Sequence, residues 1–533
     1  MFALIFFLTG LVVLPYPGIQ NDEALFAASV FQIPGGSIFD FTILQVRVPV
    51  MHLTYLGALK TWVYAGILAI APSSYWTVRV PVLLIGAVTI WLFVGLLGII
   101  HGRAAAWIGG ALLATDTMFL LTTCFDWGPV AFQHLLLVAG MLGILSFFLK
   151  GSRAALCFGF FCFGLGMWDK ALFVWMLSGL AIAGMLVFPA ELWRRLSLRN
   201  VGLATAGFLL GALPLVIYNC ASGFATFRSA DGLVFNEFSG KLRGLRGTWD
   251  GSALLGYIAS GPDQSVQARD ARTGIERVSV AVRTAFGEHS RNRLELAIYG
   301  ALLLAPFWWR TKSRRLLLFS LIAIAVAWLE MAITKRAGWP AHHVVLLWPI
   351  PHLFLAVAFA EMSLRWRGMA ARRLAAGAVV VVVSFLALQN LLVTNQYLYQ
   401  LIRYGSPRAW TDAIYPLADE VRRLEPSEVV IDDWGIFSPL VLLGRGKLPL
   451  LTVDQAFLAT SSSEAQKNWD RGLLERGLWV GHTRAYQEFT AITDQVVSAA
   501  GAAGFKKQLI KMVSDGNGRP AFEIFRFVRA ETR

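Results

Sequence analysis

About eleven long apolar stretches run through this chain, and they constrain its fold more than any other feature. A membrane core about 30 Å thick is crossed by a helix of roughly 20 apolar residues, and several stretches are somewhat shorter than that. With 56% hydrophobic and only 15% charged residues among 533, the composition is that of an integral membrane protein. The stretches lie at about 2–15, 78–100, 104–122, 129–149, 154–168, 171–188, 201–219, 294–309, 315–333, 343–361 and 374–393. The sequence therefore predicts a polytopic α-helical membrane protein with about eleven transmembrane helices and additional interfacial helices.

Clustered basic residues give the expected orientation, because Lys and Arg concentrate in short cytoplasmic loops. The net charge of +14 is explained in this way without invoking nucleic acid. The apolar segment 48–71 is the ambiguous one, since Lys60 near its centre would cost about 2.5–3.5 kcal/mol at the bilayer midplane. If 48–71 does not span and the N-terminus is cytoplasmic, nearly all basic clusters fall on the cytoplasmic side. We therefore expect 48–71 to be an interfacial or re-entrant helix on the outer face.

Two domains are expected. Residues 1–393 form the transmembrane domain, with long outer loops at 16–77 and 220–293, the second of which is long enough to cap a site. Residues 394–533 contain strand patterns, including a hairpin across Asp515-Gly-Asn-Gly, that alternate with helical patterns. They predict a small α/β domain outside the cytoplasm. Met1 opens directly into apolar sequence, so the first segment is interpreted as a retained anchor.

Three acidic residues are the candidate catalytic groups: Asp22 and Glu23 in the first outer loop, and Asp126 in the second. A carboxylate held at the membrane surface can accept a proton from an acceptor hydroxyl or amine. Asp126 is a candidate second carboxylate that orients the nucleophile, or that shares a divalent cation with Asp22. The alternatives are structural: Asn21 can cap a short helix whose first turn is stabilised by Asp22 and Glu23, and Asp126 can be a solvated turn acid.

Cations on the same outer face are candidate ligands for a phosphate group. They are Arg79, Lys170, Lys335, Arg336, His342 and His343. A local ion pair between Asp169 and Lys170, and interfacial snorkelling of Lys335 and Arg336, are the structural alternatives. Acids and cations on one membrane face fit sugar transfer from an isoprenoid phosphate. The leaving phosphate then needs positive charge but no general acid, and one carboxylate base serves the acceptor.

At these positions the chain resembles the GT-C glycosyltransferases, in particular the family of protein O-mannosyltransferases and lipid A aminoarabinose transferases. The resemblance covers roughly residues 1–360. It rests on the Asp22-Glu23 pair, Val48-Pro-Val-Met-His-Leu-Thr-Tyr, Val78-Arg-Val-Pro, Asp126, Gly164-Leu-Gly-Met-Trp-Asp-Lys170 and His342-His-Val-Val-Leu-Leu-Trp-Pro349. It implies a GT-C-like fold and makes Asp22 the proposed base, with Glu23 as its neighbour. Asp169 in place of the usual Thr, Ala171 in place of Gly, and His342-His343 in place of Arg-Tyr depart from the family pattern.

The predicted function is therefore an inverting glycosyltransferase of a bacterial cytoplasmic membrane. It would move a sugar from a polyprenyl-phosphate carrier to a lipid, glycan or protein acceptor on the outer face. Membrane lipids and these substrates are the expected partners, and nucleic acid is not. No cofactor is required, although a divalent cation at Asp22 and Asp126 stays open. A lipid or polyprenyl-phosphate flippase and a noncatalytic scaffold are the rival interpretations.

Overall fold

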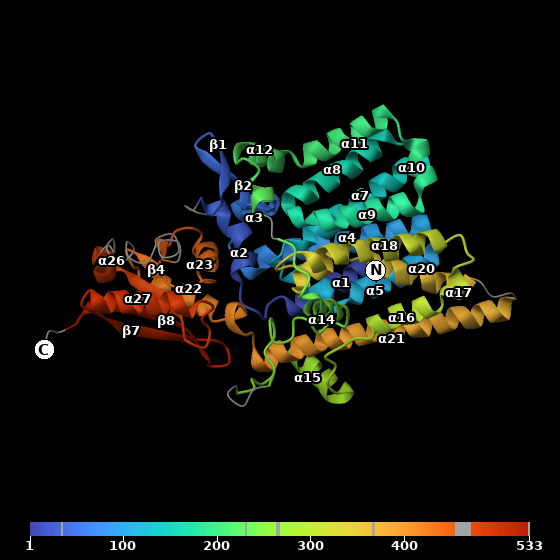
Figure 1. Ribbon diagram of the computed structural model, residues 1–533. Helices are drawn as coiled ribbons and strands as arrows, with labels where there is room; N and C mark the ends of the chain where they lie inside the picture. The colour runs from blue at the N-terminus through green and yellow to red at the C-terminus, as the bar shows by residue number, and fades with distance from the viewer. Residues whose placement is uncertain (33–35, 230–231, 263–266, 365–367, 454–470, 531–533) are drawn as a thin grey trace.

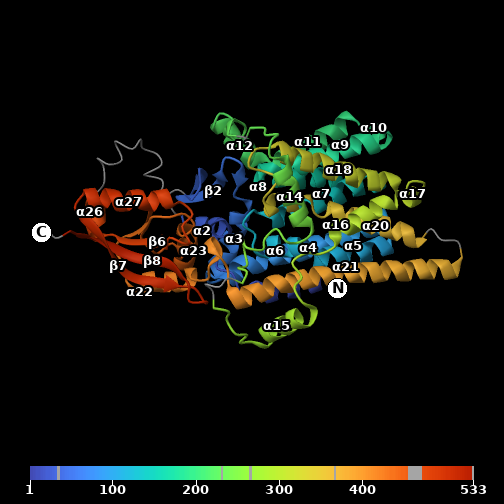
Figure 2. The same cartoon turned by 60° about the horizontal axis from the view of Figure 1, so that its bottom comes forward.

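The computed structural model describes residues 1–32, 36–229, 232–262, 267–364, 368–453 and 471–530. A large helical body and a smaller sheet-containing domain lie end to end (Figure 1). The turned view shows the same arrangement, in which the sheet domain extends from the end of the body that carries α2 and α3 (Figure 2).

The helical body contains the predicted apolar stretches as helices or bent helix pairs. They are α1 Phe2–Val13, α4 Tyr75–Ile100, α5 Arg103–Thr115, α6 Thr117–Cys124, α7 Val130–Lys150, α8 Arg153–Asp169, α9 Val174–Val187, α11 Leu198–Gly211, α12 Leu213–Ala221, α16 Leu294–Leu303, α17 Ala305–Trp308, α18 Arg314–Ile333, α19 Ala341–Val344, α20 Ile350–Leu364 and α21 Met369–Tyr404. By length and composition, four helices in the described ranges can cross a membrane, and up to eight spans result if each bent pair counts as one. Further apolar helices such as α1 and α16 are shorter, so the count of about eleven remains a prediction.

Shorter helices lie in the connections. They are α2 Asn21–Ala28, α3 Leu59–Ile70, α10 Pro189–Arg195, α13 Ala225–Arg228, α14 Phe238–Trp249 and α15 Gly274–Phe286. α15 packs along α21, and α14 packs against α19, so the loop 220–293 lies against the body.

The segment 48–71 is helical only in its second half, which corrects the predicted continuous helix. Its first half forms strand β2 (Val46–Leu53) and strand β3 (Leu56–Gly57), and β2 pairs in antiparallel fashion with β1 (Phe39–Ile43). The alternating β-branched residues at the start of this segment favour a strand. Only α3, twelve residues long, matches the predicted helix, and it is too short to cross a bilayer straight.

The last helix of the body also differs from the expectation. α21 continues without a break from Met369 to Tyr404, across the expected domain boundary at residues 393 and 394. Polar residues of its final part, Thr394, Gln396 and Gln400, are buried against the body rather than in solvent. The prediction from hydropathy therefore placed the C-terminal end of this helix too early in the sequence.

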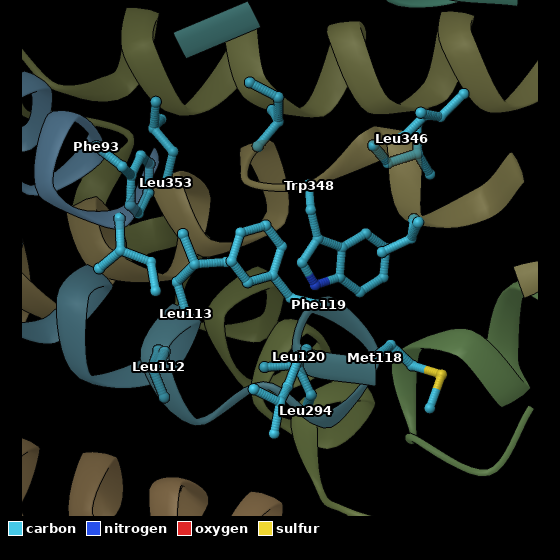
Figure 3. Close-up of a cluster of buried hydrophobic side chains, with 14 of the residues drawn as sticks. Phe93, Leu112, Leu113, Met118, Phe119, Leu120, Leu294, Leu346, Trp348 and Leu353 are labelled. Carbon is cyan, nitrogen blue, oxygen red and sulfur yellow. The ribbon is translucent and has the colours of Figure 1, made fainter. Parts of the chain in front are cut away.

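The centre of the body is a buried hydrophobic core around the bend between α5 and α6. Phe119 and Trp348 lie next to each other there, and Leu112 and Leu113 of α5 lie nearby with Leu353 of α20 (Figure 3). Asp116 ends α5 and caps α6 by accepting a hydrogen bond from the Phe119 N–H at 2.7 Å. This buried cap fixes the bend, which turns α6 towards the site loop at residues 125–129.

The C-terminal part forms a mixed five-stranded sheet in the order β5-β4-β6-β8-β7. The strands are β4 Val429–Ile431, β5 Leu450–Thr452, β6 Leu478–His482, β7 Phe505–Ser514 and β8 Pro520–Arg529. β4 pairs in parallel with β5 and β6, and the β7–β8 hairpin is antiparallel. One face is covered by α22 (Ile414–Arg423) and α23 (Phe437–Gly444), and the other by α27 (Thr490–Ala502), while the short α26 (Arg471–Arg476) precedes β6. Strands at the predicted positions, with helices on both faces, agree with the α/β expectation.

The sheet domain is attached to the body through α2. Ala24 and Ala28 of α2 form one buried cluster with Val441 and Leu442 of α23. The Arg445 guanidinium also donates hydrogen bonds to the carbonyls of Leu68 and Ala71 at the end of α3. Ala24 and Ala28 of α2 are thus covered by protein.

Candidate active site

Asp22 lies in the first turn of α2. The helix begins with a capping box in which the Gln20 side chain accepts the backbone N–H groups of Asp22 and Glu23, at 2.7 and 3.2 Å. Gln20 rather than Asn21 is therefore the capping residue, and Asn21 donates instead to the Asp22 carboxylate. Asp22 stays partly exposed. Burial by its surroundings raises the pKa of the Asp22 carboxyl, while the Asn21 hydrogen bond and the charge of Lys170 oppose that shift.

Glu23 points the other way, into a buried ion pair with Arg79. The two carboxylate oxygens of Glu23 accept from Arg79 Nε and Nη2 at 2.6 and 2.8 Å. The remaining guanidinium N–H groups donate to the carbonyls of Leu14, Pro17 and Gly18 at 2.7–2.9 Å. A guanidinium has five N–H groups, so none is left for a phosphate. Both side chains are buried, and the geometry gives this pair a role in holding the first loop rather than in the chemistry that the sequence assigned to it.

Asp126 is fully buried and paired with a residue that the sequence analysis did not place in the site. Its Oδ2 atom lies 2.9 Å from Lys60 Nζ, and that ammonium also donates to the Asp126 carbonyl at 2.6 Å. Its Oδ1 atom accepts the N–H groups of Val130 and Ala131 at the start of α7. Asp126 is thus neither a solvated turn acid nor free to bind a metal, because both oxygens are already engaged.

Phe26 connects Lys60 to the helix of Asp22. Lys60 Nζ lies 4.7 Å from the centre of the Phe26 ring, a cation–π contact. Phe26 follows Asp22 by four residues, so the two side chains lie on the same face of α2. This contact brings Asp22, Lys60 and Asp126 to the same end of the helical body, as the sequence predicted for the two acids.

Lys170 lies directly after α8 and is also buried. Its Nζ atom donates to the Gly128 carbonyl at 3.2 Å, two residues after Asp126. Its charge interacts, in decreasing order, with the carboxylates of Asp169, Asp126 and Asp22. Asp169 also accepts a hydrogen bond from the Gln133 side chain at 2.8 Å. Lys170 therefore lies within electrostatic range of both candidate acids.

His342 and His343 lie on α19, within electrostatic range of Lys170. The Trp127 indole N–H donates to His342 Nδ1 at 3.0 Å. An indole nitrogen can only donate, so Nδ1 carries no proton and the ring is neutral. His342 can therefore contribute a hydrogen bond through Nε2, but not the positive charge that the sequence analysis considered.

Lys335 and Arg336 lie in the exposed turn between α18 and α19. The Lys335 backbone N–H donates to the Gly232 carbonyl, which ties this turn to the loop 220–293. The two cations thus lie on the chain segment that leads to His342, outside the buried cluster around Lys170.

The loop 220–293 reaches the site through Tyr257. Its ring lies 5.9 Å from that of Trp127 and 6.2 Å from that of Trp410, which precedes the sheet domain. Burial raises the pKa of the Tyr257 phenol to about 12, and the charges of Asp22 and of Glu488 in the sheet domain act in the same direction. Tyr257 thus packs the loop 220–293 against Trp127 and Trp410, within electrostatic range of Asp22.

No group of three or more His, Cys, Asp or Glu side chains in the described ranges is placed to hold a metal ion. The Asp126 oxygens are taken by Lys60 and two backbone N–H groups. A cation shared by Asp22 and Asp126 would have to compete with these contacts of Asp126, and it stays a prediction.

Comparison with known proteins gives the class. Residues 57–218, less than a third of the chain, match the family of dolichyl-phosphate-mannose-protein mannosyltransferases. Together with the structural likeness below, this confirms the predicted resemblance: the chain has the fold of a GT-C superfamily glycosyltransferase. No curated protein sequence matched the chain.

Two solved structures carry the structural likeness. The chain resembles ArnT from Cupriavidus metallidurans bound to undecaprenyl phosphate, with a TM-score of 0.58 and 13% identity, over 98% of this chain and 97% of that chain. It resembles the same protein in the apo state with a TM-score of 0.56 and 14% identity, over 98% and 96%. At such identities the likeness concerns the fold alone.

Sequence reasoning missed Lys60 as a site residue, although it used the same lysine to argue against a span. A lone Lys inside an apolar segment is itself a signal, because it must find a partner when it is buried. The partner, Asp126, could not be identified from the sequence since 66 positions separate the two.

Proposed function

We propose that the protein is an inverting glycosyltransferase. It moves a sugar from a polyprenyl-phosphate donor to an acceptor on the outer face of a bacterial cytoplasmic membrane. The observation that carries this proposal is a partly exposed carboxylate, Asp22, within electrostatic range of the buried cation Lys170. The buried Lys60–Asp126 pair contacts the same helix α2 through Phe26. The fold shared with a protein solved with undecaprenyl phosphate supports a polyprenyl-phosphate donor.

In the proposed reaction Asp22 acts as the general base. Its raised pKa makes its carboxylate a stronger proton acceptor than that of an ordinary exposed aspartate. It takes the proton from the acceptor hydroxyl or amine as that atom attacks the anomeric carbon from the face opposite the phosphate. A single displacement of this kind inverts the configuration at that carbon.

Lys170 and Lys60 stabilise the departing phosphate. The leaving group already carries negative charge, so cations lower the barrier without a general acid. Asp126 keeps Lys60 in place and partly neutralises it, which makes Asp126 a positioning residue. Glu23 and Arg79 hold the loop that carries Asp22, while His342 supplies a neutral hydrogen-bond donor.

The proposal leaves the surrounding elements with defined roles. The loop 220–293 covers the site through Tyr257, and Lys335, Arg336 and His343 line the approach of the donor headgroup. The domain boundary lies at the end of α21, and the sheet domain stands outside the cytoplasm and contributes Glu488 to the rim of the site. The acceptor is a lipid, glycan or protein.

The test combines cells and purified protein. Glycans and glycoproteins from cells with the wild type or with Asp22→Asn are compared by mass spectrometry. Transfer is then measured in proteoliposomes with a panel of polyprenyl-phosphate sugars. We expect Asp22→Asn to abolish one defined sugar modification, while Asp270→Asn, which changes a carboxylate that is 99% exposed, leaves it intact. Equal glycan profiles for wild type and Asp22→Asn would overturn the proposal.

A flippase is the alternative that the same experiment separates. It requires a polar path through the membrane interior, and the body does bury Asp116 and His352, 3.2 Å apart. Asp116 is, however, committed to the cap of α6, so the pair is explained by the bend between α5 and α6. Scrambling of a fluorescent lipid phosphate in proteoliposomes, without sugar transfer, would favour the flippase.

A further inference from the structure

The β1–β2 hairpin ends in an apolar tip that nothing in the described ranges covers. Its exposed apolar side chains are Ile43, Leu44 and Val46, and Leu44 is 93% exposed. The polar Thr42, Gln45 and Arg47 are exposed beside them. β1 is also an edge strand, because the sheet order is β1-β2-β3. An exposed apolar edge of this kind marks an interaction surface.

The two central residues of the turn at the tip, Leu44 and Gln45, rarely adopt the backbone conformation that this turn requires. Ile43 pairs with Val46, so Leu44 and Gln45 form a two-residue turn, with φ angles of 48° and 66°. Such turns strongly prefer Asn-Gly, because both central residues need positive φ. A leucine with positive φ costs backbone strain. An apolar environment around the Leu44 side chain would compensate for that cost.

The base of the hairpin is fixed at the edge of the helical body. Val50 and Met51 are buried with Trp168 of α8 and Leu215 of α12. The Trp168 indole also donates to the Val50 carbonyl at 3.0 Å. In both views the hairpin lies beside α12, to one side of the sheet domain (Figures 1 and 2). The tip therefore stands at the level where the helical body ends.

The neighbouring surface has the composition of a membrane interface. α12 exposes Leu213 and Val216, and the adjoining corner exposes Phe224 and Phe227. This corner is tied to the hairpin by a hydrogen bond from Thr226 to the Thr54 carbonyl. Aromatic residues at the ends of membrane helices mark the lipid headgroup region.

A cation accompanies the apolar tip. Arg47 follows Val46 and is exposed, with its guanidinium held by the Gln32 carbonyl at 2.9 Å. Apolar side chains next to an arginine suit a surface where lipid tails meet phosphate headgroups.

We propose that the tip of the β1–β2 hairpin inserts into the outer membrane leaflet, with Ile43, Leu44 and Val46 in the lipid and Arg47 at the phosphates. The hairpin thereby anchors the chain between α2, which carries Asp22, and α3, which carries Lys60. This anchor depends on the chain being a membrane protein, but not on the proposed glycosyl transfer.

The first test measures the depth of the tip. A nitroxide is attached at Leu44→Cys in protein whose Cys157 and Cys220 are replaced by Ser, since Cys124 and Cys162 are buried. The protein is placed in vesicles of phosphatidylethanolamine and phosphatidylglycerol, and collisions with lipid-soluble oxygen and a water-soluble nickel chelate are compared. We expect oxygen to dominate at Leu44, while the chelate dominates at the control Gln508→Cys on β7.

Two results would overturn the proposal. One is a chelate accessibility at Leu44 equal to that at Gln508, which would place the tip in water. The other is dipolar broadening between labels, which would show that the edge strand pairs with a second copy of the chain.

A second test needs no cysteine. Leu44→Asn with Gln45→Gly gives the turn its preferred residues but removes the apolar tip. In vesicles we expect amide hydrogen exchange in β1 and β2 to be faster in this variant than in the wild type, because the lipid contact is lost. Slower exchange in the variant would mean that turn preference alone governs the hairpin, and would contradict the anchor.

Discussion

The strongest prediction concerns Arg79, because the structure changes the role that its sequence position indicated. Arg79→Gln removes the cation of a fully buried ion pair and leaves the Glu23 carboxylate without its partner. It also removes the guanidinium donors to the Leu14, Pro17 and Gly18 carbonyls. Removing one member of such a buried pair costs about 3–5 kcal/mol.

The assay is thermal unfolding of the purified protein in detergent, with activity scaled to the folded fraction. For a chain of 533 residues we expect the unfolding midpoint to fall by about 3–5 °C. Glu23→Gln combined with Arg79→Gln should cost less than the sum of the two single changes, because no buried charge is then left unpaired.

An opposite result would restore the phosphate-binding role of Arg79. If Arg79→Gln unfolds at the wild-type temperature but no longer binds undecaprenyl phosphate, the guanidinium serves the donor and the reasoning from its five hydrogen bonds is wrong. Asp22→Asn is the matched control, since this change in the same loop should lower activity without lowering the unfolding temperature.

The remaining predictions concern protonation and charge. The rate of sugar transfer should rise with pH as Asp22 loses its proton. The midpoint should lie above that of an exposed aspartate, because burial raises the pKa of Asp22. Asp22→Asn should lower the plateau rate by roughly 10²–10⁴-fold, and a pH profile of single-turnover rates checks both expectations. Lys60→Met should destabilise the fold by about 3–5 kcal/mol, and Lys60→Met with Asp126→Leu should recover much of that loss in thermal unfolding but not the activity. Burial and the nearby Asp433 charge raise the pKa of Asp432 to about 8. Folding therefore takes up a proton between about pH 4 and 8. The free energy of unfolding should fall as pH rises through that window, by up to about 1.4 kcal/mol per pH unit. Asp432→Asn should remove this dependence in denaturant unfolding, and an unchanged pH profile would refute the assignment.

Much of the helical body could be predicted from the sequence, because span-length apolar stretches have few alternatives to helices in a membrane. Where prediction failed, tertiary contacts decided the outcome. The start of 48–71 is apolar enough for a helix but pairs with β1, and α21 continues past residue 393 because the body buries its polar side chains.

The sequence predicted which residues of the candidate site lie on the same face of the membrane, but not which of them contact each other. The sequence indicated that Asp22, Asp126 and Lys170 share one face, and the structure brings them to one end of the body. It could not show that Glu23 faces Arg79 while the adjacent Asp22 faces the site, since a helix turns by about 100° between neighbours. Nor could it show that Asp126 takes Lys60, because long-range pairing leaves no local pattern.

Helix α2, which carries the candidate base Asp22, packs between α3 and α23. A chain truncated after α21 would leave Ala24 and Ala28 without the wall formed by Val441 and Leu442. The sheet domain therefore helps to position α2. A chimera that exchanges this domain would have to preserve the α23 surface in order to keep Asp22 in its position.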